Sequence, residues 1–214
     1  IYWQCLVSGS HIFPGLAVST VVTPENGWAH YAFVRNGTTF TIYKNGVAGD
    51  SATDATGIPA LAAALEIGRI EGGSQYYTGY IDSYRISDSA RYTADFTAPT
   101  SAFVNDGNTK LLIQSGTDGS NTFDDLSTPD HTITANGDVR WFAPKVGAGA
   151  MAFVPDGINS GFKTTAVPFG GNRDMWMGKW TLEFWIKFND VTGGGTYPNM
   201  WACTTIGGTT EKIR

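Results

Sequence analysis

The sequence predicts an all-β fold, an antiparallel β-sandwich, on three observations. The 214 residues include 27 glycines, and 42% of the chain is apolar, which is enough for a hydrophobic core. Turn pairs of the Asn-Gly type separate stretches in which apolar and polar residues alternate, as they do in half-buried strands. The sequence contains no long amphipathic helical pattern.

A three-stranded meander is the strongest local signal. Residues 28–35 (WAHYAFVR) and 38–44 (TTFTIYK) have strand character, and each stretch is followed by an Asn-Gly pair, at 36–37 and 45–46. Asn-Gly favours a type I′ turn because both central residues need a positive φ. We therefore expect two tight hairpins in succession.

Further strands are expected along the rest of the chain. They are residues 65–70, 79–87, 110–114, 131–135, 150–154, 180–188, 200–206 and 211–214. A short helical turn is expected from Ser89 to Phe96, with Ser89 as its cap, and residues 100–108 are expected to be a linker. Two sheets should pack over a shared core made of Trp28, Phe33, Ile42, Ile81, Phe153, Phe184 and Ile186.

Charge and cysteine content exclude some classes of function. The formal net charge is −5 and no cluster of Lys and Arg stands out, so nucleic acid is not an expected partner. No apolar run approaches the roughly 20 residues of a membrane-spanning helix, so membrane insertion is not expected. Cys5 and Cys203 have no metal-binding or redox spacing; we expect two buried thiols, or a disulfide if the chain ends meet.

Motifs in the second half of the chain resemble the opening of a known family. An apolar strand at 110–114 is followed by residues 123–132 (FDDLSTPDHT), then 153–157 (FVPDG) and the strand 181–186 (TLEFWI). Such elements are similar to the early part of LamG-like domains of the concanavalin A-like lectin/glucanase superfamily.

Motifs in the first half resemble the later elements of the same family. They are residues 28–34 (WAHYAFV), 42–46 (IYKNG), 79–83 (GYIDS) and 90–100 (ARYTADFTAPT). The last of these is similar to a form found in phage tail and bacterial surface proteins.

The resemblance implies that the halves stand in permuted order. Residues 1–99 look like the C-terminal half of a jelly roll, residues 100–108 like a linker, and residues 109–214 like the N-terminal half. The halves could complete one domain or belong to two neighbouring repeats. We therefore expect a segment taken from a tandem array of similar domains.

The fold and role implied by the resemblance are those of a jelly-roll binding or structural module. We expect a non-catalytic structural or adhesive module of an extracellular fibre, a viral tail appendage or a surface protein, located outside the cell, at its surface or on a virion. Expected partners are a glycan or cell-surface ligand and further copies or neighbouring repeats. The alternatives are a carbohydrate-binding lectin domain and, third, a glycoside hydrolase.

No catalytic residues are predicted. Related glucanases carry their acids on one strand as Glu-x-Asp-x-x-Glu, and a glycosidase needs a pair of carboxyl groups. The five glutamates of this chain do not form that pattern. The strand at 79–87 offers Asp82 alone, and Glu183 is interpreted as one face of its strand.

The resemblance also implies a structural calcium ion. Carried over position by position, its ligands would be Asp82, Asp125 and Asp130. Leu126, Pro129 and Asp130 replace the Ser, Gly and Asn that are usual in the family's loop. The alternative is that Asp125 and Asp130 form Asx-turns and that Asp82 accepts hydrogen bonds from the backbone.

Glycan binding would require aromatic rings that a sugar can reach. The candidates are rings outside the clearest strand patterns, namely Tyr76, Tyr77, Trp141, Trp176 and Trp201. The alternative is that these rings pack at sheet edges or at contacts between subunits.

Overall fold

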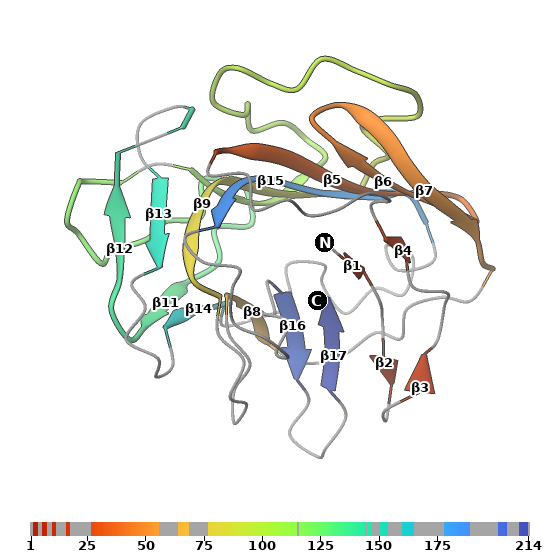
Figure 1. Cartoon of the computed structure of the whole chain (residues 1–214). Coiled ribbons are helices and arrows are strands. Elements are labelled where there is room, and N and C mark those ends of the chain that lie inside the picture. Colours follow the sequence, from red (N-terminus) through yellow and green to blue (C-terminus); the bar gives the residue numbers. More distant parts are fainter. Residues whose placement is uncertain are drawn as a thin grey trace.

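A computed structural model shows the predicted all-β chain (Figure 1). The described residues are 27–55, 64–68, 77–114, 116–143, 145–146, 160–164 and 178–188, together with the backbone of the strands Tyr2–Trp3, Leu6–Val7, Ser10–His11, Leu16–Ala17, Ala150–Phe153, Trp201–Thr204 and Thr210–Ile213. This described part holds no helix, and therefore no helix long and apolar enough to cross a membrane.

The larger of two main sheets has eight strands. Its order is β12 (Val139–Phe142), β13 (Ala150–Phe153), β9 (Gly79–Ser87), β15 (Trp180–Phe188), β5 (Ala29–Asn36), β6 (Thr39–Lys44) and β7 (Val47–Thr53), and β10 (Thr109–Ile113) also pairs with β9. Every pairing is antiparallel. Strand β15, from the second half of the chain, lies between β9 and β5 from the first half.

The smaller sheet has five strands and lies below the larger one in Figure 1. Its order is β11 (Ile133–Asn136), β14 (Gly161–Thr164), β8 (Ala64–Ile67), β16 (Trp201–Thr204) and β17 (Thr210–Ile213). Two short pairs complete the described strands: β1 (Tyr2–Trp3) with β4 (Leu16–Ala17), and β2 (Leu6–Val7) with β3 (Ser10–His11). The result is the two-layered antiparallel sandwich that the sequence predicts.

Both predicted hairpins form, and the turns differ in type. Asn45 and Gly46 have φ of 52° and 85°, as a type I′ turn between β6 and β7 requires. In the first hairpin Asn36 is paired with Thr39, so the turn residues are Gly37 and Thr38. Gly37 has φ of 66°, and Thr38 is not a positive-φ residue, which is the pattern of a type II′ turn.

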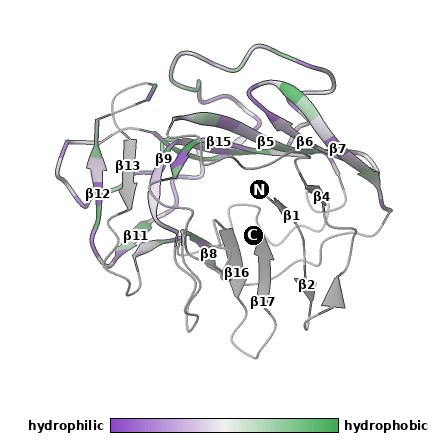
Figure 2. Ribbon diagram, viewed as in Figure 1, coloured by the Kyte–Doolittle hydropathy of each residue, from purple (hydrophilic) through white to green (hydrophobic). Residues whose placement is uncertain are grey.

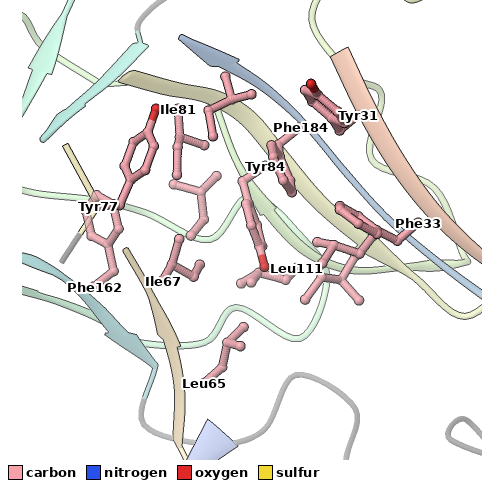
Figure 3. Close-up of a cluster of buried hydrophobic side chains, with 14 of the residues drawn as sticks. Tyr31, Phe33, Leu65, Ile67, Tyr77, Ile81, Tyr84, Leu111, Phe162 and Phe184 are labelled. Carbon is pink, nitrogen blue, oxygen red and sulfur yellow. The ribbon is translucent and has the colours of Figure 1, made fainter. Parts of the chain in front are cut away.

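The core lies between the two sheets and contains most of the residues expected there. Phe33, Ile42, Ile81, Phe184 and Ile186 are buried in one cluster. Figure 3 shows Leu65, Ile67 and Phe162 of the smaller sheet pointing toward side chains of the larger one, among them Tyr84, Leu111 and Phe184. Trp28 was expected in this core and instead is half-buried just before β5. The side chain of Phe153 lies outside the described part.

Each strand of the larger sheet has one apolar face and one mixed face. On β15, Leu182, Phe184 and Ile186 join the core, whereas Glu183 and Lys187 point to the other side because successive side chains alternate. Figure 2 shows the same mixture of apolar and polar residues along the strands of this sheet. We call the side that points away from the smaller sheet the outward face.

Residues 88–108 cross the outward face, and we call this segment the strap. It is the yellow-green loop above β5 and β6 in Figure 1. The helical turn expected at residues 89–96 does not form; the segment has no regular secondary structure, and its aromatic side chains pack down on the sheet. Residues 100–108, the expected linker, also lie against the sheet: Phe103 is buried, and its backbone N–H and C=O both bond to the side chain of Gln114.

Candidate functional site

A bulge in β9 determines which side chains reach the outward face. Ser83 has φ of 52°, and the register between β15 and β9 shifts between Glu183 and Trp185. Asp82 and Arg85 therefore both point outward, while Tyr84 between them stays in the core. The bulge thus brings the Arg85 guanidinium directly opposite Glu183 on the neighbouring strand.

A buried group of polar side chains, which we call the Glu183 cluster, lies under the strap. It consists of Glu183 on β15, Arg85 on β9, His30 on β5 and Tyr92 of the strap. Arg85 donates to Glu183 Oε1 through Nε at 2.8 Å and Nη2 at 2.6 Å. The Tyr92 hydroxyl donates to Oε2 at 2.7 Å, and His30 Nε2 lies 3.3 Å from the same oxygen. Both carboxylate oxygens are therefore engaged.

The environment of Glu183 keeps its carboxylate ionised. The side chain is fully buried, and burial alone would raise its pKa. The hydrogen bond from His30 and the charge of Arg85 outweigh that penalty, so the pKa of Glu183 lies below its ordinary value. Burial, together with the charge of the same carboxylate, raises the pKa of Tyr92.

Aromatic rings surround the cluster and close it to solvent. The His30 ring has edge contacts with Tyr92, Phe96, Phe103 and Trp185, at centroid distances of 5.4–6.4 Å. The Arg85 guanidinium lies 4.2 Å from the centroid of the Phe103 ring. A carboxylate enclosed in this way is poorly placed to receive a proton from a substrate, and the cluster is suited to fastening the strap to the sheet.

Further bonds fasten the strap at both of its ends. Arg91 forms a bidentate ion pair with Asp106: Nη1 donates to Oδ2 at 3.0 Å and Nη2 to Oδ1 at 2.8 Å. This pair joins the two ends of the strap. The Thr181 hydroxyl of β15 donates to the Ser89 carbonyl and accepts from the Arg91 N–H. The hydrogen bonds with Arg91 lower the pKa of Asp106, so the carboxylate of that pair is ionised at neutral pH.

The β6–β7 turn holds the middle of the strap. The Phe96 N–H donates to the Gly46 carbonyl at 2.8 Å. A Cβ added at Gly46 would lie 1.8 Å from the Phe96 carbonyl oxygen, so the strap packs where glycine leaves room. The Asn45–Gly46 pair thus serves both the turn and the docking of the strap.

The opposite end of the outward face carries a row of accessible rings, which we call the aromatic patch. It consists of Trp28, Tyr80 and Phe142. Tyr80 lies between the other two, 6.1 Å from the Trp28 centroid and 5.5 Å from that of Phe142. Trp28 and Tyr80 are half-buried, and Phe142 is 51% exposed. Stacking surface is therefore open to a ligand here.

Two lysines accompany the aromatic patch. Lys187 Nζ lies 5.6 Å from the Tyr80 ring centroid, and Lys145 Nζ lies 4.9 Å from that of Trp185. Lys145 is exposed and Lys187 half-exposed, and neither has an ion-pair partner among the described residues. The open end is thus both aromatic and positively charged.

Asp82, a predicted calcium ligand, is buried between these regions and has protein partners. One oxygen accepts from the N–H groups of Lys145 and Val146, at 2.8 and 2.7 Å, and the other from the Ser83 hydroxyl at 3.1 Å. Burial raises the pKa of Asp82 to about 6, against the lowering effect of these bonds.

Asp125, the second predicted ligand, is surrounded by hydrogen-bond donors. Its oxygens accept from the N–H groups of Leu112, Ser127 and His131, from the Ser127 hydroxyl, and from His131 Nδ1 at 2.7 Å. Burial would raise its pKa, but the bonds from His131 dominate and lower the pKa to about 2. Asp125 organises its loop in the way that the Asx-turn alternative describes.

The three predicted ligands do not form one metal site in the described structure. Asp130 is exposed, has φ of 50°, and bonds through its N–H to the Ser127 carbonyl. The described residues contain no group of three or more His, Cys, Asp or Glu that could hold a metal ion. Donors directed at Asp82 and Asp125 occupy the lone pairs that a cation would need, so these residues do not fit the calcium site that the family resemblance implies.

Two of the predicted glycan-binding rings lie in the core. Trp141 is 1% exposed, packs on Phe123, and donates its indole N–H to the Thr122 carbonyl. Tyr77 is 2% exposed and donates its hydroxyl to the Lys187 carbonyl at 2.7 Å. Rings buried to this extent have no face for a sugar, so the prediction is corrected at these two positions. Tyr76, Trp176 and the side chain of Trp201 lie outside the described part.

The accessible rings were not among the predicted residues, although part of the signal is in the sequence. Because side chains alternate along a strand, a core position at Ile81 places Tyr80 on the outward face, and a core position at Trp141 does the same for Phe142. Which member of the pair Trp141–Phe142 faces the core depends on the pairing of β12 with β13, which the sequence does not display.

Comparison with known families identifies part of the chain. Residues 2–96 match a laminin G family model whose description is the Concanavalin A-like lectin/glucanases superfamily. The match confirms the family resemblance over that part. Neither the curated proteins nor the solved structures give a match to this chain.

Proposed function

Since residues 2–96 match the concanavalin A-like lectin/glucanase superfamily model, we propose that this chain is a non-catalytic structural and adhesive module. The observation that carries the proposal is the Glu183 cluster. On the outward face, the carboxylate of Glu183 is fully buried and bound by Arg85, Tyr92 and His30. The hydrogen bond from Tyr92 to this carboxylate holds the strap on the sheet and keeps the outward face rigid.

The surroundings of the two outward acids also favour the non-catalytic role over a glycoside hydrolase. A glycosidase needs one carboxyl group that gives a proton to the leaving oxygen and a second that reaches the sugar or a water. Glu183 and Asp82 are the acids of β9 and β15 on the outward face, and both are 0% exposed. A sugar would reach neither without displacement of the strap or of Lys145 and Val146.

The adhesive part of the proposal rests on the rigid scaffold and its open aromatic patch. A sandwich whose surface segment is fixed by a hydrogen bond to a buried carboxylate and by the Arg91–Asp106 ion pair presents its remaining surface in one arrangement, which suits binding to a partner. We place such a module in an extracellular fibre, a viral tail appendage or a surface protein, where it binds a cell-surface ligand or associates with other copies.

A hydrolysis assay tests the non-catalytic role. The protein is incubated with a panel of soluble plant, algal and bacterial polysaccharides, and new reducing ends are measured beside the variant Glu183→Gln. We expect no release above the buffer blank from either protein. Release by the wild type that is lost in Glu183→Gln would overturn the proposal.

Carbohydrate binding is the second candidate function, and the aromatic patch favours it. Rings that are open on one side stack against the apolar faces of sugars, and Trp28, Tyr80 and Phe142 provide such a row. A glycan array with the labelled protein tests this candidate. Signals above background that disappear in Phe142→Ala would support it, and an array without signals would count against it.

We extend the proposal to a tandem array, because residues 1–99 resemble the later elements of the family and residues 109–214 resemble its early elements. In such an array, weak sites on successive copies would act together through a high effective concentration. Residues that flank this segment in its parent chain provide the test: the same motifs repeated there would support the array, and unrelated flanks would contradict it.

A further inference from the structure

We infer that Asn36 is a modification site, at which the folded chain converts its side-chain amide spontaneously into aspartate and isoaspartate. The site is the turn between β5 and β6, and the inference does not depend on what the protein binds. The chain contains four Asn-Gly pairs, which begin at Asn26, Asn36, Asn45 and Asn136. Asn26 lies outside the described part, and the structure surrounds the other three pairs differently.

The reaction needs only the two residues of the pair and water. The backbone nitrogen of the glycine forms a bond to Cγ of the asparagine, the Cγ–Nδ2 bond breaks, and ammonia leaves with the proton of that nitrogen. Water then opens the resulting succinimide ring at either of its carbonyls, which gives aspartate or isoaspartate. Glycine favours the first step because no Cβ shields its nitrogen. The surroundings of each pair therefore decide how readily the ring closes.

The Asn36–Gly37 pair is open where the reaction takes place. Both residues are exposed, and a Cβ added at Gly37 would meet no atom within 4 Å beyond the neighbouring residues. The Asn36 side chain and the Gly37 N–H form no hydrogen bond among the described residues. Arg35 Nε donates to the Gly37 carbonyl at 2.8 Å, a bond that engages the carbonyl and not the attacking nitrogen. The side-chain amide can therefore turn toward that nitrogen without breaking a hydrogen bond.

The Asn45–Gly46 pair is held at both of its residues. Asn45 Oδ1 accepts from the His30 N–H at 2.9 Å, so its Cγ is fixed against β5. Gly46 is buried, and the Phe96 carbonyl oxygen of the strap occupies the space where a Cβ would lie. Closing the ring moves both residues of the pair. Reaction here consequently requires the strap to leave the turn.

The Asn136–Gly137 pair is restrained in a similar way. Asn136 Nδ2 donates to the Thr134 carbonyl at 3.3 Å, and a Cβ added at Gly137 would lie 2.6 Å from Ser160 Oγ. The same Ser160 hydroxyl accepts from the Asp138 N–H, which joins the end of β11 to the residue before β14. One dipeptide is thus restrained in two turns and unrestrained in the third.

Isoaspartate at position 36 would alter the hairpin, because it adds one carbon atom to the backbone before Gly37. Asn36 is paired with Thr39 at the end of β5, so the added atom disturbs the register there. It also moves the Gly37 carbonyl relative to Arg35, which is 1% exposed and relies on acceptors within the protein. Conversion to either product adds one negative charge to a chain whose formal net charge is −5.

Peptide mapping of the incubated protein tests the inference. Trypsin places the four pairs in separate peptides, which are residues 1–35, 36–44, 45–69 and 111–140. The folded protein is kept at mildly alkaline pH, and mass spectrometry follows the replacement of NH2 by OH at each asparagine. We expect Asn36 to convert about tenfold faster than Asn45 or Asn136, because those pairs must first open locally. Labelling with an isoaspartate methyltransferase identifies the isoaspartate product.

Two controls separate protection by the fold from the reactivity of the dipeptide itself. In concentrated urea, Asn36, Asn45 and Asn136 should convert at rates within about threefold of one another, because the fold no longer restrains them. Phe96→Ala loosens the strap over Gly46, so it should speed conversion at Asn45 and leave the rate at Asn36 unchanged. Equal rates at the three positions in the folded protein would overturn the inference, as would an Asn36 that converts in urea and stays intact in the folded protein.

A comparison with Asn36→Asp tests the effect on the hairpin. This variant has the added charge without the added backbone atom. The isoaspartate form, separated by chromatography, should unfold at a lower urea concentration than freshly prepared Asn36→Asp. Unfolding of both at the same urea concentration would contradict a disturbed hairpin.

Discussion

The covered and open ends of the outward face share the strands β9 and β15, yet their polar groups are satisfied differently. At the covered end, every oxygen of Glu183 has a partner, and the strap closes over it. At the open end, Lys145, Lys187 and the indole N–H of Trp185 have ring contacts but no anion or acceptor among the described residues. The ends differ in the side chains that β9 and β15 present and in the segments that lie beside them: the strap at the covered end, and β12 with the residues after it at the open end.

This difference separates a fastening from a binding surface. A buried carboxylate with both oxygens bonded gives specificity and rigidity, because the loss of a partner leaves a costly unpaired group. The cluster still contains one buried atom, His30 Nδ1, that has no hydrogen bond in the described structure. Groups that are left unsatisfied at an accessible position can gain partners from a ligand. Substitutions should therefore affect stability at the covered end and ligand binding at the open end.

The largest effect is expected when the charge of Glu183 is removed. Glu183→Gln leaves the buried Arg85 without a counter-ion and should lower the free energy of unfolding by about 3–5 kcal/mol. Urea denaturation followed by tryptophan fluorescence measures it. The double variant Glu183→Leu, Arg85→Leu should lose less than the single one, because an apolar pair leaves no unpaired charge. A loss below about 1 kcal/mol for Glu183→Gln would contradict the importance of the cluster.

The same substitution at two tyrosines compares the two ends directly. Tyr92→Phe removes a hydrogen bond to an ionised carboxylate and should cost about 1.5–3 kcal/mol. Tyr80→Phe removes a hydroxyl that has no hydrogen bond among the described residues and should change stability by less than about 0.5 kcal/mol. Equal losses in urea denaturation would remove the distinction between the ends. Limited proteolysis should cut the strap faster in Tyr92→Phe and leave Tyr80→Phe unchanged.

Asp82, between the two ends, should make stability depend on pH. Its pKa is raised to about 6 in the folded chain from 3.8, so the folded state holds the proton more tightly than the unfolded state. Stability from this group is therefore fully present below pH 3.8 and is lost as pH rises through 6. Asn cannot ionise, so the free energy of unfolding of Asp82→Asn lacks this pH dependence. The difference in that free energy, variant minus wild type, should increase by about 1 kcal/mol from pH 5 to pH 7. A difference that stays constant over this range would show that Asp82 titrates normally.

The sequence was most informative where the pattern is local. The bounds of β9 and β15 agree with the prediction because alternating residues mark them, and the Asn45–Gly46 turn follows from backbone preference alone. The strap was predicted to hold a helical turn because Ser89 is a residue type that caps helices, but Tyr92 and Phe96 do not form a helix face. Their rings stack at 3.5 Å and pack with Tyr43 of the sheet instead, a contact that exists only in the assembled fold.

The Glu183 cluster could not be predicted because its members are distant in the sequence. Glu183 lies 98 residues from Arg85 and 153 from His30, and the bulge at Ser83 decides that Arg85 points outward. Strands β12 and β14 were missed because each is only four residues long and contains a charged residue, Arg140 in β12 and Lys163 in β14, so neither shows a clear apolar alternation. Burial of Trp141 rather than Phe142 likewise depends on strand pairing.

The smallest effect is expected from calcium at the predicted aspartates. Family resemblance selects Asp82, Asp125 and Asp130, but five hydrogen bonds already converge on Asp125, and each donor turns its positive end toward the space that a cation would fill. We therefore expect the same melting temperature, within about 1 °C, for the wild type and for Asp130→Asn, with calcium in excess or with a chelator. Thermal unfolding followed by circular dichroism measures both proteins. Stabilisation by calcium that is present in the wild type and absent from Asp130→Asn would restore the family site, and would require the donors around Asp125 to move aside when the ion binds.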